Sequence, residues 1–296
     1  RPRDGGVGPM RESLAGLTTI FRRELATVLR TPGYGVLGVG LLALLVGIVA
    51  VGGGGATGFV PAVVDLLLPT EVVVPLVAFV LGYRALLTDT ESGEFAVVRT
   101  YPVGVGGYVL GVVLARVVGL LVVVGAPYVL VGVGIWLTAA PDTGIFATHS
   151  GVDSPWLYVR FLAFVVPFAA TYLALATAVS AVAASRRAAI ALGALAVVLG
   201  VLGGDLAAVG SLAGGTSPEA ISGLLVRTPN GAFRGLVFEH VVGVAFAPEG
   251  GFVATGRALA SLAAWTVVPT AVSAATLAYG RRLDAFLERV RASRRE

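Results

Sequence analysis

Several apolar runs of about twenty residues dominate this sequence and constrain its fold more than any other feature. An α-helix needs about 20 mainly apolar residues to cross the hydrocarbon core of a bilayer. The charged fraction is 13%, about half of the roughly 25% that is typical of soluble domains. Six segments have the required length and apolarity: Gly33–Val51, Val72–Leu87, Tyr108–Leu137, Leu157–Ala184, Ala188–Leu212 and Leu259–Tyr279. The sequence therefore predicts an all-α, polytopic membrane protein with six transmembrane helices.

A further apolar run, FVPAVVDLLLP at Phe59–Pro69, precedes the second of these spans. Its eleven residues are too few to cross a bilayer. We expect it to form a partial helix at the membrane interface rather than part of a span.

The distribution of arginine predicts the orientation of the spans, because basic residues favour the cytoplasmic side. All 21 basic residues are arginine; four of them fall in predicted outer segments and Arg116 lies within a span. The other sixteen share the side of the N-terminus: Arg1, Arg3, Arg11, Arg22, Arg23, Arg30, Arg84, Arg99, Arg186, Arg187, Arg281, Arg282, Arg289, Arg291, Arg294 and Arg295. Both termini are therefore expected to be cytoplasmic.

The segment before the first span has the pattern of an amphipathic helix. Apolar residues recur at steps of three and four, at Leu14, Leu17, Phe21, Leu25 and Val28. The other side carries Arg22, Arg23, Glu24 and Thr27. Such a helix fits the cytoplasmic membrane interface, although an ordinary cytoplasmic packing helix would show the same pattern. We divide the chain into a cytoplasmic N-terminus (1–32), a six-helix membrane domain (33–280) and a basic cytoplasmic tail (281–296).

The stretch DTESGEFAVVRTYPV, Asp89–Val103, forms a charged cytoplasmic loop between the second and third spans. After Gly93, apolar residues at helical spacing run up to Pro102 and predict a short helix along the membrane surface. A solvated connector, whose charges only keep the loop out of lipid, is the alternative interpretation.

Together, the amphipathic helix, the six spans and this loop resemble the ABC-2 type family of transporter permeases. Members have an interfacial elbow helix, six spans and a charged loop after span two that contacts the ATPase subunit. The loop commonly has an acidic residue, then E-x-G-T, then a leucine-rich turn ending in P-V or P-I. Here Glu91–Glu94 supply ESGE and Pro102–Val103 supply the end of the pattern. Phe95 does not match the usual threonine region, and Val97, Val98 and Arg99 replace the leucines.

Within the family, the chain is similar to the members of one subgroup in three features. These are the short outer loops, the long connection between spans five and six, and the elbow helix. This subgroup contains the nitrous-oxide reductase accessory permeases, which are associated with copper-enzyme maturation. The chain has no cysteine and two histidines, so its composition supplies no evident copper ligands and we expect no metal site.

The resemblance implies a plasma-membrane permease subunit that couples ATP hydrolysis on a separate cytoplasmic subunit to transport or force transmission. The chain itself has no G-x-x-x-x-G-K-[ST] motif and no lysine, so we expect no enzymatic activity and no cofactor beyond the partner's ATP. The expected partners are the ATPase subunit, a second permease copy, an extracellular accessory protein and membrane lipids, but not nucleic acid. The residues implied in contact with the ATPase are Asp89, Glu91, Ser92, Gly93, Glu94, Arg99 and Pro102 in the loop, and Phe21, Arg22, Arg23, Glu24 and Leu25 in the elbow.

Two ionisable residues lie at unusual depth, Arg116 in the third span and Asp205 near the outer end of the fifth. Buried ionisable groups in a membrane are costly and are functional candidates by default. For Arg116 the alternative is that its long side chain reaches the inner headgroups. For Asp205 we favour a simple position at the outer interface.

The long outer connection, residues 213–256, contains a second helical pattern after Pro229. Phe233, Leu236, Val237, Val241 and Val244 would share one face of this helix. Packing of this face over the membrane domain is favoured over a role as a gate or docking surface. His149 and His240 fall in outer segments, but neither has the spacing of a metal site.

Three other classes of function are less well supported by the sequence. A gradient-driven secondary transporter would need paired acids near the midplane and an internal repeat, and the predicted spans show neither. A non-transporting membrane scaffold needs no coupling loop. A membrane-embedded hydrolase lacks a histidine at the depth of Ser180 and Ser185.

Overall fold

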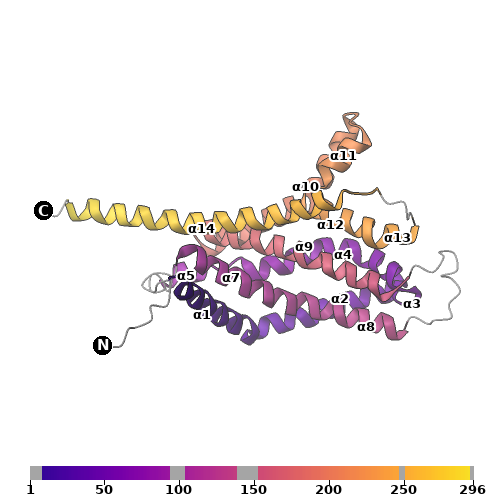
Figure 1. The fold of residues 1–296 in the computed structure, drawn as a ribbon, viewed down its shortest axis with the longest axis horizontal. Helices are drawn as coiled ribbons and strands as arrows, with labels where there is room; N and C mark the ends of the chain where they lie inside the picture. The colour runs from indigo at the N-terminus through magenta and orange to yellow at the C-terminus, as the bar shows by residue number, and fades with distance from the viewer. Residues whose placement is uncertain (1–8, 94–103, 139–152, 247–250, 294–296) are drawn as a thin grey trace.

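The computed structural model describes residues 9–93, 104–138, 153–246 and 251–293, and within these ranges every regular element is a helix (Figure 1). Six helical segments within these ranges are long and apolar enough to cross a membrane: Pro32–Gly52, Phe59–Glu91, Val105–Thr138, Pro155–Val182, Arg186–Ala213 and Thr255–Tyr279. The predicted all-α fold with six membrane spans is therefore confirmed.

The helices follow the chain in a simple up-and-down order. The first half contains α1 (Pro9–Arg30), α2 (Pro32–Gly52), α3 (Gly54–Thr57), α4 (Phe59–Gly82), α5 (Leu87–Glu91), α7 (Val105–Leu120), the π-helical turn η1 (Leu121–Gly125) and α8 (Ala126–Thr138). The second half contains α9 (Pro155–Val182), α10 (Arg186–Ala213), α11 (Pro218–Leu225), α12 (Pro229–Val237), the π-helical turn η3 (Phe238–Val242), α13 (Gly243–Phe246) and α14 (Thr255–Ser293).

The prediction for Phe59–Pro69 is wrong. These residues are the first half of α4, which continues through Pro69 and Pro75 to Gly82. The second span thus begins thirteen residues before the predicted Val72. The start of α4 is capped from a distant segment, since the backbone N–H groups of Phe59 and Val60 donate to the Asp153 carboxylate at 2.9 and 3.1 Å. Neighbouring helices tolerate proline inside a span because they satisfy the backbone groups that it frees.

Helix α9 lies at the centre of the bundle and packs along α4 and α14. Its aromatic residues form the core, where Phe168 stacks on Phe233 with ring centroids 4.3 Å apart and Phe161 contacts both Tyr128 and Tyr158. The helix predicted after Pro229 is present, because α12, η3 and α13 follow one another without a break. Its predicted apolar face is packed into the bundle, with Phe233, Leu236, Val237 and Val241 fully buried.

Helix α10 diverges from the other helices toward its C-terminal end, and α11 projects from the side of the molecule (Figure 1). Only 17% of the most apolar window of α10 is buried, compared with 50% for α9. The beginning of α1 and the end of α14 lie at one end of the bundle, and α3 and α13 lie at the other (Figure 1). We refer to these as the α1 end and the α3 end.

Candidate functional site

The side chain of Arg116 joins four helices at the α1 end of the bundle. Arg116 lies about three turns into α7, and one of its terminal nitrogens donates to Glu24 of α1 at 3.1 Å. The other terminal nitrogen donates to the hydroxyl of Tyr34 on α2 and to the backbone carbonyl of Leu81 on α4, both at 3.1 Å. The guanidinium is therefore held inside the protein. The alternative in which Arg116 reaches the headgroups is wrong.

Glu24 is the elbow residue that faces the interior. The sequence placed it on the polar side of the amphipathic helix together with Arg22 and Arg23, and both arginines are exposed. Glu24, however, is only 5% exposed. Burial raises the pKa of the Glu24 carboxyl above its ordinary value, and the positive charge of Arg116 opposes this rise. Phe21 and Leu25 are partly buried. The helical prediction for this segment is confirmed, whereas its position in the membrane interface remains a prediction.

Small residues allow α1 to approach α7 closely. A Cβ atom at Gly111 would lie 2.9 Å from Cγ2 of Ile20, and one at Gly119 would overlap the side chain of Val28. Ile20 and Val28 are both buried. The glycines of α7 thus form the surface on which α1 packs, and Glu24 lies between the two contacts.

The beginning of the predicted coupling loop is fixed to the same part of the bundle. Asp89 of α5 is buried and accepts a hydrogen bond from the hydroxyl of Tyr108 on α7. The backbone N–H groups of Leu86 and Leu87 both donate to Oγ of Ser180 on α9, at 3.0 Å. Helix α5 is therefore attached to two spans at once. Asp89 also lies close enough to Glu24 for the negative charge of Asp89 to raise the pKa of Glu24.

The remaining loop residues divide into two groups. Glu91, Ser92 and Gly93 are exposed at the end of α5, and Gly93 has a φ of +75°, in the left-handed region that favours glycine. Glu94, Arg99 and Pro102, together with the short surface helix predicted after Gly93, lie outside the described residues. The structure thus brings three predicted site residues together, namely Glu24, Asp89 and Arg116. It also adds Tyr34, Tyr108 and Ser180, none of which carries a charge that would have drawn attention in the sequence.

A second polar network lies on the side of the bundle where α10 departs. Nε of Arg234 on α12 donates to Glu71 of α4 at 2.8 Å, and a terminal nitrogen makes a second bond to the same carboxylate. Both terminal nitrogens of Arg234 also donate to Asp205 of α10, each at 3.0 Å. Asp205 therefore belongs to an ion-pair network, and its position at the outer interface stays a prediction.

This network extends to α9 through Asn230, the second residue of α12. The hydroxyl of Tyr172 donates to Oδ1 of Asn230, and Nδ2 of Asn230 donates to the carbonyl of Glu71 at 3.2 Å. Glu71 is 2% exposed and lies about 18 Å along α4 from its first residue. The expectation that the spans lack acids near the midplane is therefore wrong, because Glu71 lies midway along α4. The predicted second span begins at Val72, one residue after Glu71, so the hydropathy pattern leaves this acid outside the membrane.

The histidine and acidic residues of the α3 end have structural partners. Nε2 of His240 is 2.8 Å from the hydroxyl of Thr255, and Asp153 caps α4. Across the described part of the chain, no three His, Asp or Glu side chains cluster as ligands for a metal ion. His149 lies outside the described residues.

Six spanning helices define a polytopic membrane protein. Polar contacts join α1 to α7 through Glu24 and Arg116, and they join the turn at α5 to α7 through Tyr108 and to α9 through Ser180. Residues 15–282 match the model of a family described as ABC-2 family transporter protein. Because this match covers most of the chain, the chain belongs to that family.

A curated relative, the "Probable ABC transporter permease protein NosY" of Pseudomonas aeruginosa, is 32% identical over 170 residues. The aligned part is 55% of this chain and 58% of the relative, so it covers less than two thirds of the relative's length. This similarity supports the narrower resemblance to the nitrous-oxide reductase accessory permeases.

Proposed function

We propose that this ABC-2 family permease receives mechanical work from a separate cytoplasmic ATPase subunit at the α1 end of the bundle. In this proposal the exposed end of α5, Glu91–Gly93, and the exposed face of α1 form the docking surface. The arginine distribution of the sequence supports a cytoplasmic location for this end and for both termini. Residues 1–32 and 281–296 are then the cytoplasmic segments on either side of a plasma-membrane domain.

The observation that carries this proposal is the set of contacts made by Arg116. A force applied to α1 reaches α7, α2 and α4 through one guanidinium, which binds Glu24, Tyr34 and the carbonyl of Leu81. A force applied to α5 reaches α7 through Tyr108 and α9 through Ser180. Both receiving elements are thus connected to the spans by short, buried contacts. Such contacts favour rigid-body movement of the helices over local bending.

The exposed apolar surface of α10 supports the expectation of a second permease copy. Only 17% of the residues in its most apolar window are buried in its own bundle, so many side chains of this span are available to contact lipid or another chain. We propose a dimer, with an extracellular accessory protein at the α3 end as the subgroup resemblance implies. The permease contributes no catalytic group in this scheme, and ATP is bound by the partner.

Reconstitution with the ATPase subunit tests the proposal. Glu91→Arg and Gly93→Trp alter the docking surface and should reduce co-purification of the two subunits. Tyr108→Phe removes the hydroxyl that holds Asp89 and should leave co-purification intact while stimulation of ATPase activity by the permease is lost. Tyr279→Phe, at a residue that is 69% exposed, is the matched control. Wild-type co-purification and stimulation in the first three variants would overturn the proposal.

One observation favours the alternative of a gradient-driven transporter. Glu71 is an acid buried at depth within a span, as such a transporter would need. Both Glu71 and Asp205 are nevertheless bound to Arg234, which is the arrangement of a structural ion pair rather than of a free proton or cation site. Ion-gradient-driven uptake into vesicles that lack the ATPase subunit would decide for the alternative.

A further inference from the structure

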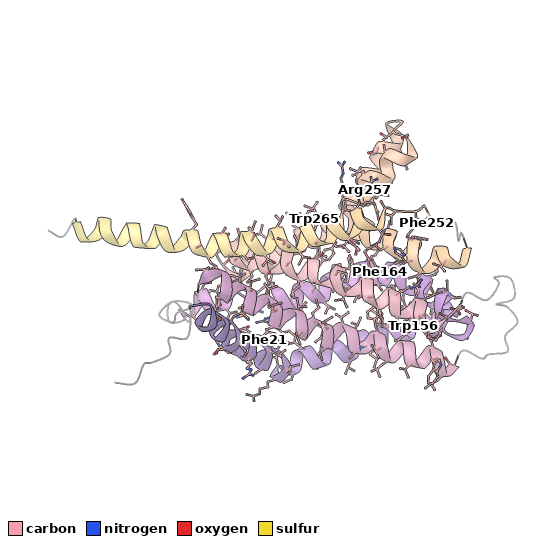
Figure 2. The ribbon with its side chains drawn as sticks, in the orientation of Figure 1. Phe21, Trp156, Phe164, Phe252, Arg257 and Trp265 are labelled. Atoms are coloured by element: carbon pink, nitrogen blue, oxygen red, sulfur yellow. The ribbon has the colours of Figure 1, made fainter. Side chains whose placement is uncertain are left out.

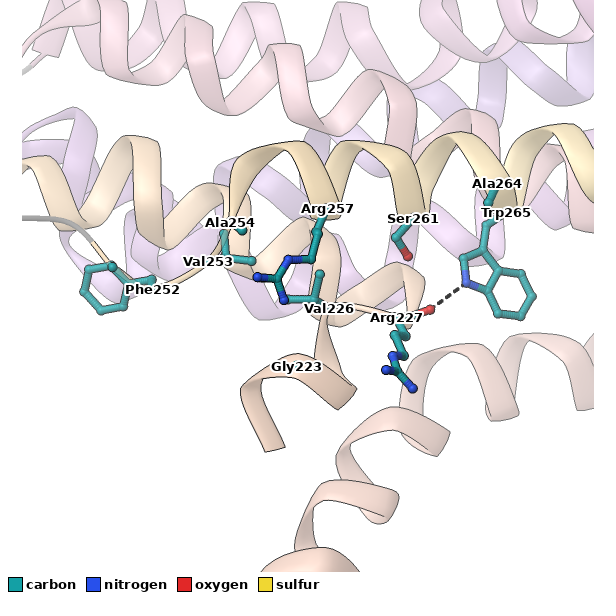
Figure 3. A pocket seen from close by; sticks show the side chains of 11 residues that line it. Gly223, Val226, Arg227, Phe252, Val253, Ala254, Arg257, Ser261, Ala264 and Trp265 are labelled. Carbon is teal, nitrogen blue, oxygen red and sulfur yellow. Dashed lines mark hydrogen bonds between the residues drawn. The ribbon is translucent and has the colours of Figure 1, made fainter. Parts of the chain in front are cut away.

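A pocket of about 640 Å³ lies between α14 and the segment that joins α11 to α12 (Figure 3). Its volume falls within the range of about 300–1,000 Å³ that is typical of ligand sites. Arg227 and Arg257 both line the pocket, one from each wall, and Trp265 and Ser261 lie along α14 beside them (Figure 3). The pocket is distinct from both polar networks described above.

The walls of this pocket are held in place by hydrogen bonds. The indole N–H of Trp265 donates to the carbonyl of Arg227 at 2.8 Å, which joins the two walls (Figure 3). The segment that carries Phe252 and Val253 is bound by Glu239 of η3, whose carboxylate accepts the backbone N–H groups of residues 251–253 at 2.7 to 3.3 Å. The pocket is therefore a defined feature of the fold and not a gap between loosely placed side chains.

The two arginines that line the pocket are available for a ligand. Within the described ranges, neither the Arg227 nor the Arg257 guanidinium forms an ion pair or hydrogen bond, and both side chains are exposed. This contrasts with Arg116 and Arg234, each of which binds at least one carboxylate. Two guanidinium groups at one site are suited to a phosphate, which they bind through charge-assisted and bidentate hydrogen bonds.

The position of the pocket favours a phosphate that is attached to an apolar tail. Trp265 lies about 15 Å along α14 from its first residue, so the pocket flanks a membrane span on the side from which α11 projects (Figure 2). From Ser261 and Trp265 the same face of α14 continues to Val268 and Val272, which are 59% and 43% exposed. An acyl chain could follow this apolar face while its headgroup occupied the pocket.

We propose that this pocket binds an anionic phospholipid, with the headgroup phosphate between Arg227 and Arg257 and the acyl chains along α14. The exposed apolar face makes a membrane lipid a better occupant than a free phosphate ion. The proposal is independent of coupling to an ATPase, because none of its residues takes part in the contacts at the α1 end.

Fluorescence of Trp265 tests this proposal in the full-length chain. Trp136 and Trp156 are 66% and 71% exposed, so a Trp136→Phe/Trp156→Phe background should fold normally and leave Trp265 as the single tryptophan. The protein is reconstituted in bilayers of phosphatidylcholine with a small fraction of brominated phosphatidylglycerol or brominated phosphatidylcholine. Bromine quenches a nearby indole, so preferential binding of the anionic lipid should produce the stronger quenching.

The arginine variants identify the groups that carry this preference. Arg227→Gln/Arg257→Gln should weaken binding of phosphatidylglycerol relative to phosphatidylcholine by about tenfold or more. Arg186→Gln/Arg187→Gln removes the same charge from the exposed beginning of α10 and should leave the preference unchanged. Equal quenching by both lipids, or a preference that survives in the first double variant, would overturn the proposal. Loss of the preference on addition of inorganic phosphate would instead assign the pocket to a free anion and overturn the lipid assignment.

Discussion

Arg116 on α7 and Glu24 on α1 are 92 positions apart in the sequence, and their side chains form an ion pair at 3.1 Å. The two side chains are only 11% and 6% exposed. In such a buried pair the loss of one partner is far more destabilising than the pair itself is stabilising, because a charge remains without compensation. The pair thus favours one position of α1 on α7 over any partly detached position. This property is the one that a force-transmitting contact requires.

The two single substitutions in this pair should differ in their dependence on pH. Glu24→Gln leaves the buried Arg116 charge without its carboxylate partner, and arginine stays protonated, so the variant should be destabilised at pH 8.0, where Glu24 of the wild type is ionised. Burial already raises the pKa of the Glu24 carboxyl in the wild type. Arg116→Gln removes the positive charge that opposes this rise. The Glu24 carboxyl can take up a proton instead.

The sign of the pH effect follows from proton binding. In Arg116→Gln the folded protein holds the Glu24 proton more tightly than the unfolded chain does, so stability falls as pH rises from about 4.5 through the raised folded-state pKa. Thermal unfolding in detergent at pH 5.0 and 8.0 measures this directly. Arg116→Gln should be closer to wild type at pH 5.0, whereas the unfolding temperature of Glu24→Gln should not shift with pH on account of this pair, because position 24 then has no carboxyl to titrate. A pH-independent deficit in Arg116→Gln would contradict the buried, raised carboxyl.

The contact between α1 and α7 can also be tested without altering any charge. Gly119→Ala places a methyl group against Val28 and should destabilise the protein by about 1–3 kcal/mol, because α1 must move away. Gly106→Ala, on the same helix, should be neutral or stabilising by up to about 1 kcal/mol. Among the described residues, no heavy atom lies within 4 Å of a Cβ at Gly106. Melting temperatures of the two variants give the comparison, and equal values would exclude close packing at Gly119.

Most of the fold could be predicted from the sequence, because spanning length and apolarity identify a membrane helix with little help from tertiary contacts. The second span was the exception. Pro69, Asp65 and Glu71 interrupt the apolar pattern of Phe59–Gly82, yet the structure accommodates each of them. Asp65 accepts the backbone N–H of Gly54 at 2.9 Å, and Glu71 is bound by Arg234. A hydropathy pattern reflects the unfavourable free energy of burying these acids. It contains no information on the hydrogen-bond and ion-pair partners that offset this free energy in the folded protein.

The candidate site could be predicted only in part, for the same reason. Charge at an unexpected depth identified Arg116, and the loop and elbow patterns included Asp89 and Glu24. The pairing of Arg116 with Glu24 depends on the approach of α1 to α7 at Gly111 and Gly119, which a helical pattern does not encode. The amphipathic pattern even placed Glu24 on the wrong side. Tyr34, Tyr108 and Ser180 act through hydroxyl groups, so neither hydropathy nor charge distinguishes them.

The network around Arg234 should show a graded response to loss of each member. Arg234→Gln leaves two carboxylates without their cation and should destabilise the protein most, by about 3–5 kcal/mol. Glu71→Gln should follow, since its side chain is only 3% exposed, and Asp205→Asn should have the smallest effect because its side chain is 41% exposed. Unfolding temperatures in detergent rank the three variants. A larger loss of stability in Asp205→Asn than in Glu71→Gln would show that side-chain exposure does not determine how much each carboxylate contributes to stability.

Glu239 provides a pH-dependent test of one wall of the pocket that Arg227 and Arg257 line. Burial raises the pKa of the Glu239 carboxyl, but hydrogen bonds from the backbone N–H groups of Val253, Gly251 and Phe252 outweigh burial and lower it below the ordinary value of 4.5. The stabilisation of this segment should therefore be complete above about pH 4.5 and should be lost as pH falls through the lowered pKa. Hydrogen–deuterium exchange of amides 251–253, expressed as protection factors, measures it. Glu239→Gln should reduce protection at pH 7 and abolish its dependence on acid, since a neutral amide oxygen is a weaker acceptor than a carboxylate. Asp153→Asn, which weakens the cap of α4 instead, should leave these three amides unchanged, and full protection in Glu239→Gln would contradict the assignment.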